Sequence, residues 1–506
     1  MQRLLRTFRK ISGVFHQQYS STVYRPLKKG PSTTTLIFLF FVLFIGAFIS
    51  ARWIDASSGA GGSTLKALVA FTPSRNRLDE IPLNCSAANI TQTCSVGYGE
   101  KFEQSSSTEV CPEYFRWIHE DLRVWKETGI SKEMVEGAKR SAFFRLTIVN
   151  GTAYTEKYRN IVEGRDVFTL WGILQLMRRY PGRLPDLDLM FNVGDKPVIR
   201  SRPKDGAPPP LFHYCGDNWS FDIVFPDWSF WGWPEINIKP WEPLLKDLKE
   251  GNERTKWVER EPYAYWKGNP AMSKGRRELV NCNVSDKQDW NGRIYKQDWI
   301  RESQQGYKQS NLANQCTHRY KIYIEGIAWS VSQKYILACD SVTLIIKPQY
   351  YDFFTRNLVP LHHYWPMRDE DKCRSMKFAV DWGNNHTQEA QAIGKAASDF
   401  IQEELKMDYV YDYVFHLLNE YAKLLTYKPV VPPNAVELCP EIMACSADGL
   451  KKKFMMESMV KSPAVRGPCT LTPSDPAHLQ AFVKEKEDTI KQVETWENKF
   501  WDNQTQ

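Results

Sequence analysis

The first candidate for chemistry is Asp195, a carboxylate that follows an apolar run through a single glycine. The run, Leu187–Val193, is short and lies between Pro185 and Gly194, so we predict a buried strand. A carboxylate at the end of a strand is well placed to act as a general base, which takes the proton from a hydroxyl as the hydroxyl attacks. A Gly-Asp pair is more often part of a turn or a helix cap, so the residue types alone leave that second interpretation open.

Two other stretches suit an anion such as a diphosphate. In residues 266–270 (WKGNP), Gly268 and Asn269 follow a strand, and Lys274, Arg276 and Arg277 open the next helix. Glycine allows close approach to the backbone, and a helix N-terminus presents unpaired N–H groups to an anion. A plain glycine turn beside surface cations explains this stretch about as well.

The second stretch, residues 325–334 (EGIAWSVSQK), is a loop of small residues leading into a helix. A nucleotide phosphate at that helix N-terminus is again consistent with the pattern. The stretch lacks the full GxGxxG and GxxxxGK[ST] patterns, which disfavours a dehydrogenase or a P-loop protein.

We predict no metal site. Asp186-Leu187-Asp188 and Asp369-Glu370-Asp371 have the Asp-X-Asp form that metal-dependent sugar transferases use, but about one such match is expected by chance. His362-His363 has no partners at metal-ligand spacing, which favours packing or a surface position. A dense aromatic stretch could stack on sugar faces, although core and cleft wall are the commoner roles; it contains Trp228, Phe230, Trp231, Trp233 and Trp241.

Helical and strand patterns alternate along the folded part of the chain, which predicts an α/β fold. The helix Asp166–Arg179 precedes the strand Leu187–Val193. The second half repeats the scheme, with strands at 263–267, 320–324 and 342–346 and helices at 274–281 and 331–338. Such repetition implies parallel sheets with helices on both faces. The Pro- and Trp-rich residues 225–243 suit an interdomain segment, so we predict two domains divided near residue 255.

Two amphipathic helices follow, at 388–405 and 414–425, and either close the second domain or cross back to the first. Residues 430–506 form an extension that contains Pro and Lys, and its last part, 476–501, has a solvated helical pattern.

The composition excludes disorder, collagen and coiled coil, because 42% of the 506 residues are hydrophobic and 25% are charged. The net charge of +7 resides in the first 35 residues, which hold seven Lys and Arg and no acid; 59 basic and 59 acidic residues remain after them. A nucleic-acid partner is therefore not predicted.

An uncharged, largely apolar stretch follows that tail. Residues 36–49 (LIFLFFVLFIGAFI), with their Thr and Ser flanks, approach the length of a bilayer-spanning helix. A signal peptide is the competing interpretation, but no cleavage pattern follows. The basic tail predicts a cytoplasmic N-terminus and a luminal chain, a type II topology.

Cysteines and glycosylation signals support a secretory location. Eleven cysteines show no CxxC pair and no Cys/His cluster at zinc spacing, which favours scattered disulfides in an oxidising lumen. Their odd number leaves at least one thiol free or intermolecular. Seven Asn-X-Ser/Thr sequons exceed the roughly three expected by chance; they begin at Asn84, Asn89, Asn150, Asn218, Asn283, Asn385 and Asn503.

Four blocks together resemble glycosyltransferase family 90, which contains the Rumi-like protein O-glucosyltransferases and the capsule-associated xylosyltransferases. These blocks are residues 184–197 (LPDLDLMFNVGDKP), 225–231 (FPDWSFW), 265–269 (YWKGN) and 316–341 (CTHRYKIYIEGIAWSVSQKYILACDS). The resemblance runs from about Cys111 to Leu425 and is closest to the plant-type members.

The resemblance implies a GT-B-like fold, in which two Rossmann-like domains face a cleft, and inverting, metal-independent transfer from a UDP-sugar. Asp195 matches the catalytic base on the acceptor side. Asn269 and Arg276 match donor-binding positions, with Arg276 facing the diphosphate. The nucleotide loop matches Ile327, Ala328, Trp329, Ser330, Val331 and Ser332, and Cys316 with Cys339 matches a family disulfide.

The sequence departs from the animal members at three places. Ser332 stands where they have an arginine, with Lys334 two residues on, so diphosphate neutralisation is shared differently. Their Phe-Arg-Gly-Ser stretch reads Trp-Lys-Gly-Asn at 266–269. The cysteine pair near their acceptor site has no counterpart around residues 155–180. A glycan or polysaccharide acceptor is therefore at least as plausible as an EGF-like repeat.

We therefore expect a type II protein of the Golgi or ER membrane that transfers glucose or xylose from UDP-glucose or UDP-xylose to a hydroxyl of a protein or polysaccharide, without a bound cofactor. The expected segments are a cytoplasmic tail (1–35), a transmembrane helix (36–54), a luminal stem (55–110), an acceptor-side domain (111–255), a UDP-sugar-binding domain (256–425) and an extension (426–506). The alternatives are a non-catalytic sugar-binding protein or scaffold on the same fold, and a metal-dependent GT-A transferase.

Overall fold

The computed structural model describes residues 81–86, 104–105, 107–161, 163–200 and 206–504. Contacts group residues 77–506 into one compact unit, which contains all of them. The predicted tail, the predicted transmembrane helix and most of the predicted stem lie outside the described residues. Within the described ranges, no helix is both long enough and apolar enough to cross a bilayer.

The second half of the chain builds a five-stranded sheet in which every neighbouring pair is parallel. Its order is β12 (Trp365–Met367), β10 (Val342–Ile346), β9 (His318–Tyr323), β7 (Glu261–Gly268) and β8 (Gly292–Lys296). The three strands predicted here are confirmed as β7, β9 and β10. The two predicted helices are confirmed as α8 (Lys274–Leu279) and α10 (Ser332–Leu337).

The first half builds a six-stranded sheet that is mixed, so the prediction of parallel sheets throughout is wrong here. Its order is β13 (Val436–Leu438), β2 (Thr152–Lys157), β1 (Phe144–Val149), β3 (Leu187–Phe191), β4 (Phe212–His213) and β6 (Ile223–Val224). β1 is antiparallel to β2 and β3, and β13 is antiparallel to β2, whereas β3, β4 and β6 are parallel.

A two-residue turn explains the antiparallel part. Asn150 and Gly151 have φ values of 49° and 75°, the left-handed pair that a tight β-hairpin requires. The pair joins β1 to β2, so a crossover helix is not needed there. The same Asn150 begins a glycosylation sequon, and its side chain is exposed at the turn.

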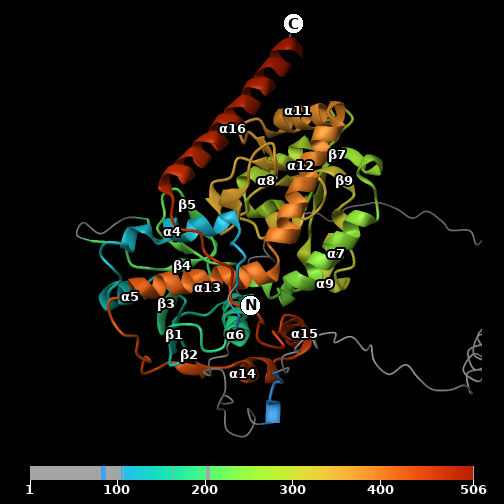
Figure 1. The fold of residues 1–506 in the computed structure, drawn as a ribbon. Helices are drawn as coiled ribbons and strands as arrows, with labels where there is room; N and C mark the ends of the chain where they lie inside the picture. Colours follow the sequence, from blue (N-terminus) through green and yellow to red (C-terminus); the bar gives the residue numbers. More distant parts are fainter. Residues whose placement is uncertain (1–80, 87–103, 106, 162, 201–205, 505–506) are drawn as a thin grey trace, which may run out of the picture. The chain divides into compact units, whose positions relative to one another are not determined.

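Helices cover both sheets (Figure 1). The predicted helix before β3 is confirmed as α6 (Arg165–Arg179), and α7 (Trp241–Glu253) leads into the second half. α11 (Lys372–Asn385) and α12 (Thr387–Asp399) pack against the parallel sheet. α13 (Met407–Leu424) crosses back to the mixed sheet, where the Tyr421 hydroxyl donates to Asp188 O at 3.1 Å.

Shorter elements complete the described unit. They are α4 (Trp117–Asp121), α5 (Lys132–Ala138), α9 (Trp299–Gln304), α14 (Pro440–Cys445), α15 (Gly449–Glu457) and the two-stranded sheet of β5 (Gly216–Asp217) with β11 (Tyr350–Tyr351). The helix predicted at 476–501 is confirmed as α16 (Pro476–Gln504), which packs on α11, where Ser375 Oγ donates to Glu497 Oε1 at 2.7 Å.

Disulfides fasten the N-terminal part of the described chain to its C-terminal part and cross-link the second half. Four bonds join pairs of described cysteines, Cys85–Cys445, Cys111–Cys469, Cys282–Cys373 and Cys316–Cys339, and the last confirms the pair implied by the family resemblance. Cys85 lies in the predicted stem, and Cys111 is the first residue after it. Their disulfides join both to the C-terminal extension, at Cys445 and Cys469. Cys215 is a free, buried thiol.

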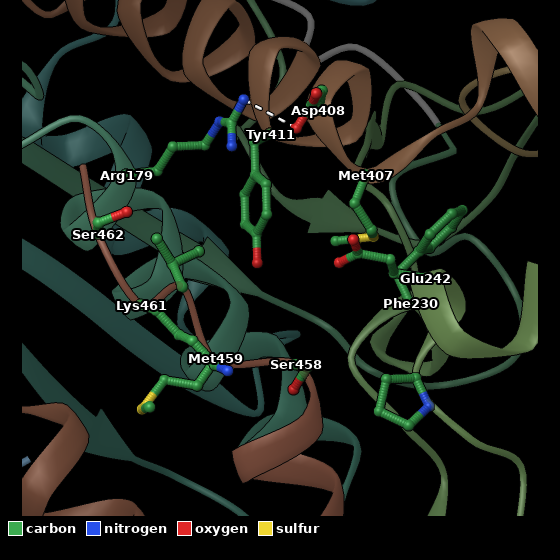
Figure 2. A pocket seen from close by; sticks show the side chains of 12 residues that line it. Arg179, Phe230, Glu242, Met407, Asp408, Tyr411, Ser458, Met459, Lys461 and Ser462 are labelled. Atoms are coloured by element: carbon green, nitrogen blue, oxygen red, sulfur yellow. Dashed lines mark ion pairs between the residues drawn. The ribbon is translucent and has the colours of Figure 1, made fainter. Parts of the chain in front are cut away.

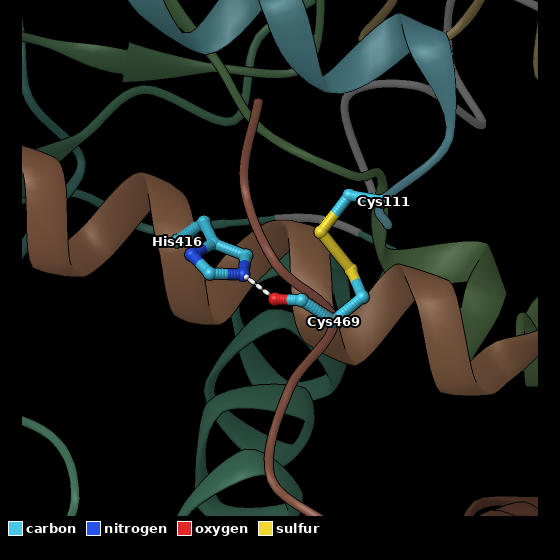
Figure 3. A group of neighbouring side chains, drawn as sticks. All are labelled: Cys111, His416 and Cys469. Carbon is cyan, nitrogen blue, oxygen red and sulfur yellow. Dashed lines mark hydrogen bonds between the residues drawn. A yellow bond between two sulfur atoms is a disulfide. The ribbon is translucent and has the colours of Figure 1, made fainter. Parts of the chain in front are cut away.

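Cys111, His416 and Cys469 are the one group at metal-ligand distance among the described residues. Figure 3 shows that the two sulfurs are bonded to each other, while His416 Nε2 donates to Cys469 O at 2.7 Å. Neither sulfur is a thiolate, so the group is a disulfide beside a packed histidine and not a metal site.

Candidate active site

Asp195 lies just beyond the carboxyl end of β3, with 40% of its side chain exposed. Arg165, the first residue of α6, donates from Nη1 to Asp195 Oδ1 at 3.0 Å and to Val193 O at 3.1 Å. Asn192 Oδ1 accepts from Gly194 N at 2.8 Å and shapes the turn between strand and carboxylate. Turn chemistry and a presented carboxylate therefore coexist at this position.

The neighbouring parallel strand β4 adds two groups that the sequence analysis missed. Cys215 Sγ donates to Asp195 O at 3.3 Å, and Cys215 O lies 3.0 Å from His213 Nδ1. Burial lowers the pKa of His213 to about 4 and raises that of the Cys215 thiol, so both are neutral near pH 7. His213 Nε2 has no hydrogen-bond partner among the described residues. Polar residues directly after the apolar Leu211-Phe212 were the available signal.

On the parallel sheet, Arg276 lies in α8 and is 9% exposed. Its Nε donates to Glu325 O at 3.0 Å, Nη2 to Ile324 O at 3.1 Å and Nη1 to Asn269 O at 3.4 Å. Three of its five N–H groups are thus used by main-chain carbonyls. No carboxylate oxygen in the described part of the chain lies within ion-pair distance of this guanidinium.

Asn269 follows β7, and its side chain accepts from Ala271 N at 2.9 Å. Burial lowers the pKa of Arg276, and nearby Tyr323 and Glu325 partly oppose that effect; the group remains a cation.

The predicted nucleotide loop follows β9 and lies against Arg276, since a Cβ at Gly326 would lie 3.5 Å from Arg276 Nη2. Ile327 is 47% exposed at the loop, whereas Ala328 and Trp329 are buried. The Ser330 main-chain N–H donates to the Tyr323 hydroxyl at 3.1 Å, and the Ser330 and Ser332 hydroxyls are 2.9 Å apart. Val331 packs against the core as a half-buried side chain.

Trp329 joins the two groups of predicted residues. Its ring centroid lies 6.3 Å from that of His213 and 5.9 Å from that of Tyr214. These two residues directly precede Cys215, whose Sγ donates to Asp195 O. The sheet of β5 and β11 makes a second link, and Glu325 Oε1 holds it by accepting from Gln349 N at 3.0 Å and Tyr350 N at 2.8 Å. The fold therefore brings Asp195 and the loop beside Arg276 into one neighbourhood.

Lys334 is engaged elsewhere. Its Nζ lies 2.9 Å from Asp227 Oδ2, and the two side chains are 2% and 4% exposed. The carboxylate outweighs burial and raises the pKa of Lys334. The idea that Lys334 shares in neutralising a diphosphate is not supported by this geometry, because the ion pair already occupies its charge.

The comparisons with known proteins agree with this arrangement. The model of "Glycosyl transferase family 90" matches residues 106–497. This chain belongs to glycosyltransferase family 90. Human Protein O-glucosyltransferase 1 is 26% identical over 365 residues, covering 68% of this chain and 88% of the relative. O-glucosyltransferase rumi of Drosophila pseudoobscura is 25% identical over 338 residues, covering 64% and 80%. Zebrafish Protein O-glucosyltransferase 2 is 28% identical over 334 residues, covering 63% and 64%.

In this family 90 chain, members of both Asp-X-Asp motifs pair with cations of the chain. Asp188 is 1% exposed and takes Arg145 Nε and Nη2 at 2.6 Å each, plus the Tyr427 hydroxyl at 2.7 Å. Asp369 pairs with Lys372 at 3.1 Å, and Asp371 precedes α11. His363 Nδ1 accepts from Val359 N at 3.0 Å, so the histidine pair is packing.

The aromatic stretch of this family 90 chain is mainly core. Trp228, Phe230, Trp231 and Trp241 are each at most 1% exposed. Of these, Trp228 contacts the partner of Asp195, because its ring centroid is 4.5 Å from the Arg165 guanidinium carbon.

A separate pocket lies away from Asp195. Figure 2 shows Arg179, Phe230, Met407, Asp408 and Tyr411 around a cavity of about 220 Å³. Arg179 ends α6 and Arg165 begins it, and 14 residues of helix span about 21 Å. We assign no role in transfer to this pocket.

Proposed function

We propose that this family 90 chain is a UDP-sugar-dependent O-glycosyltransferase that transfers glucose or xylose to a hydroxyl of a protein or polysaccharide. The names of its relatives specify protein O-glucosyl transfer, which supports this class of reaction. We further propose that it is a plant-type member with a GT-B-like fold, in which residues 111–255 bind the acceptor and residues 256–425 bind the donor.

One observation carries the proposal. Asp195 is a presented carboxylate after β3, and Arg276, in the helix after β7, has no carboxylate partner among the described residues; the two sheets meet through Trp329. Transfer from a nucleotide sugar requires a base for the acceptor and a cation for the diphosphate. Both requirements are supplied by side chains of this chain, which favours inverting transfer without a metal ion.

The proposed step is a single displacement. The acceptor O–H gives its proton to Asp195 while its oxygen forms a bond to the anomeric carbon of the sugar. The bond between that carbon and the β-phosphate oxygen breaks, and UDP leaves with the electron pair. Attack from the face opposite UDP inverts the configuration. Arg276, with Asn269 and the residues 327–332, would hold the donor and stabilise the charge that develops on UDP.

We also propose that the chain is a type II membrane protein of the Golgi or ER with this unit in the lumen. Four disulfides support an oxidising compartment. The anchor itself rests on the sequence of residues 36–54.

The test is UDP release by the detergent-solubilised full-length protein, offered UDP-glucose, UDP-xylose and other UDP-sugars with and without EDTA. Asp195→Asn is the matched variant, because it keeps the size of the side chain and removes the base. We expect donor-selective release that survives EDTA and falls by about 10³-fold in Asp195→Asn, while donor binding measured by titration is retained.

Three results would contradict the proposal. Donor binding that is unchanged in Asp195→Asn, without turnover in either protein, would favour the non-catalytic sugar-binding alternative. Loss of activity in EDTA would favour a metal-dependent transferase. Full activity of Asp195→Asn would remove Asp195 from the mechanism.

A further inference from the structure

Arg165 is tied to Asp195 more closely than any other described cation. Nη1 donates both to Asp195 Oδ1 at 3.0 Å and to Val193 O at 3.1 Å, so one nitrogen joins the carboxylate to the backbone two residues before it. Nη2 donates to Glu163 Oε2 at 2.9 Å. The guanidinium side chain is 14% exposed, whereas the two carboxylates it contacts are 40% and 42% exposed.

The guanidinium is itself held in place. Its carbon lies 4.5 Å from the centroid of the buried Trp228 ring, a cation–π contact that fixes its plane. The backbone before it is unusual, since Glu163 and Gly164 have φ values of 65° and 58° in succession. A non-glycine residue in the left-handed region costs free energy, and it is kept where the surrounding structure demands that geometry. Here it sends the first residue of α6 toward the end of β3.

We propose that Arg165 is the positioning residue of the base: it fixes Asp195 Oδ1 and leaves Oδ2 for the acceptor hydroxyl. This inference rests on the proposed function, because it assigns a role only if Asp195 takes the acceptor proton. A carboxylate with one oxygen held by a rigid fork has fewer orientations to lose when the acceptor binds.

The charges around Asp195 agree with that role. Burial would lower the pKa of Arg165, but Asp195 and Glu163 outweigh it and the pKa lies above its ordinary value. His213, the other titratable side chain that faces Asp195, is neutral above about pH 5 because burial lowers its pKa to about 4. Arg165 is therefore the positive charge that faces this carboxylate among the described residues, and Glu163 shares it.

The competing explanation is that Arg165 only secures the start of α6. The two roles differ kinetically. A purely structural residue would lower the amount of folded enzyme and leave the kcat, KM and pH profile of the folded fraction unchanged. A positioning residue would lower kcat at nearly constant donor KM, and the variant that conserves its charge would recover part of kcat.

The experiment compares Arg165→Gln, Arg165→Lys and Arg179→Gln in the full-length protein, with UDP release as the assay and active protein scaled by donor titration. Arg179 is the matched control, because it ends the same helix and pairs with Asp408 at 2.9 Å, about 21 Å from Arg165. We expect kcat to fall about 100-fold in Arg165→Gln and about tenfold in Arg165→Lys, which keeps the charge without the fork. Arg179→Gln should retain the kcat of the unmodified protein.

The split between kcat and donor KM supplies the second readout. In Arg165→Gln the donor KM should stay nearly constant while kcat falls, since Arg165 contacts the base and not the donor; Arg165→Lys should restore part of kcat. Equal kcat and donor KM values in all three variants would overturn the inference while leaving Asp195 as the base. An active Asp195→Asn protein would instead overturn the proposed function itself.

Discussion

The two sheets and their flanking segments place charge in opposite ways. On the mixed sheet, Asp188 and Asp195 each have an arginine partner, Arg145 and Arg165. On the parallel sheet, Arg276 is bound only by main-chain carbonyls among the described residues. A carboxylate paired with an arginine is held in a fixed orientation, whereas a cation without a carboxylate partner keeps its charge for an incoming anion. The contrast suggests which half handles the acceptor and which handles the diphosphate.

A second comparison lies within the mixed sheet. Asp188 is 1% exposed and doubly bound by Arg145, while Asp195 is 40% exposed and bound through one oxygen. The same pair of residue types therefore secures the fold at one position and presents a carboxylate at the other. The two carboxylates differ in their exposed fraction and in the number of hydrogen bonds that they accept from arginine.

The largest expected effect tests whether Asp188 is structural. Asp188→Asn should lower the free energy of unfolding by about 4 kcal/mol, because Arg145 would be left buried without its counter-charge. Asp186→Asn is the control, with an expected loss under about 1 kcal/mol, since Asp186 accepts only an exposed bond from Asn150 N at 2.8 Å. Urea denaturation measures both. A stable Asp188→Asn protein that has lost metal-dependent activity would make the motif catalytic and break the comparison.

The ion pair of Lys334 with Asp227, which joins the two halves, should contribute slightly less to the free energy of unfolding than the pair of Arg145 with Asp188. Lys334→Met should lower the free energy of unfolding by about 3 kcal/mol, because Asp227 stays buried without a cation. Asp227→Asn combined with Lys334→Met should recover part of the loss. The donor KM of the folded fraction should not change. A raised donor KM at unchanged stability would instead make Lys334 a diphosphate ligand.

We expect Arg276 to contribute to donor affinity. Arg276→Met should weaken donor binding about 100-fold, the loss of one or two charged hydrogen bonds, with a smaller change in stability. Arg277→Met is the neighbouring control, since Arg277 is exposed and bonds only to Ala271 O at 3.4 Å. Isothermal titration with UDP measures both dissociation constants. Equal affinities in the two variants would show that Arg276 holds the loop and not the diphosphate.

The smallest effect concerns pH and the link between the halves. Burial raises the pKa of Glu325 from 4.5 to about 7, so between these values the folded protein holds a proton that the unfolded chain has released. The contribution of Glu325 to stability should therefore fall as the pH rises from about 4.5 to about 7, by an amount on the order of 2 kcal/mol.

Glu325→Gln should remove that contribution from the pH dependence of stability, and Glu278→Gln, at a half-buried carboxylate whose pKa Lys372 lowers, should keep it. Urea denaturation at pH 5 and at pH 7.5 measures the slope in each protein. A slope unchanged in Glu325→Gln would show that Glu325 is not the titrating group.

Sequence alone located three of the five strands of the parallel sheet, but not β8 or β12. Strand, loop and helix were predicted within a few residues for β7, β9, β10, α8 and α10, because a parallel strand buried on both faces is a short apolar run followed by a crossover helix with its own period. One disulfide, Cys316–Cys339, followed from the resemblance, and the odd number of cysteines predicted at least one unpaired or intermolecular thiol; the other pairings did not follow from the sequence.

The mixed sheet was harder to predict. The hairpin between β1 and β2 depends on Asn150-Gly151, which can be a turn or simply a glycosylation signal, and β13 joins the same sheet from almost 280 residues later in the chain. Strand pairing across such a separation depends on tertiary packing, and no local pattern encodes it.

The sequence determined the candidate residues, since the types and order of Asp195, Asn269, Arg276 and residues 327–332 were visible in its motifs. Only the tertiary structure decided their partners. It gave Arg165 to Asp195 and Asp227 to Lys334, and it placed His213 and Trp329 side by side. The physical reason is that a side chain's charge and burial depend on groups that are distant along the chain, and residue spacing carries no information about them.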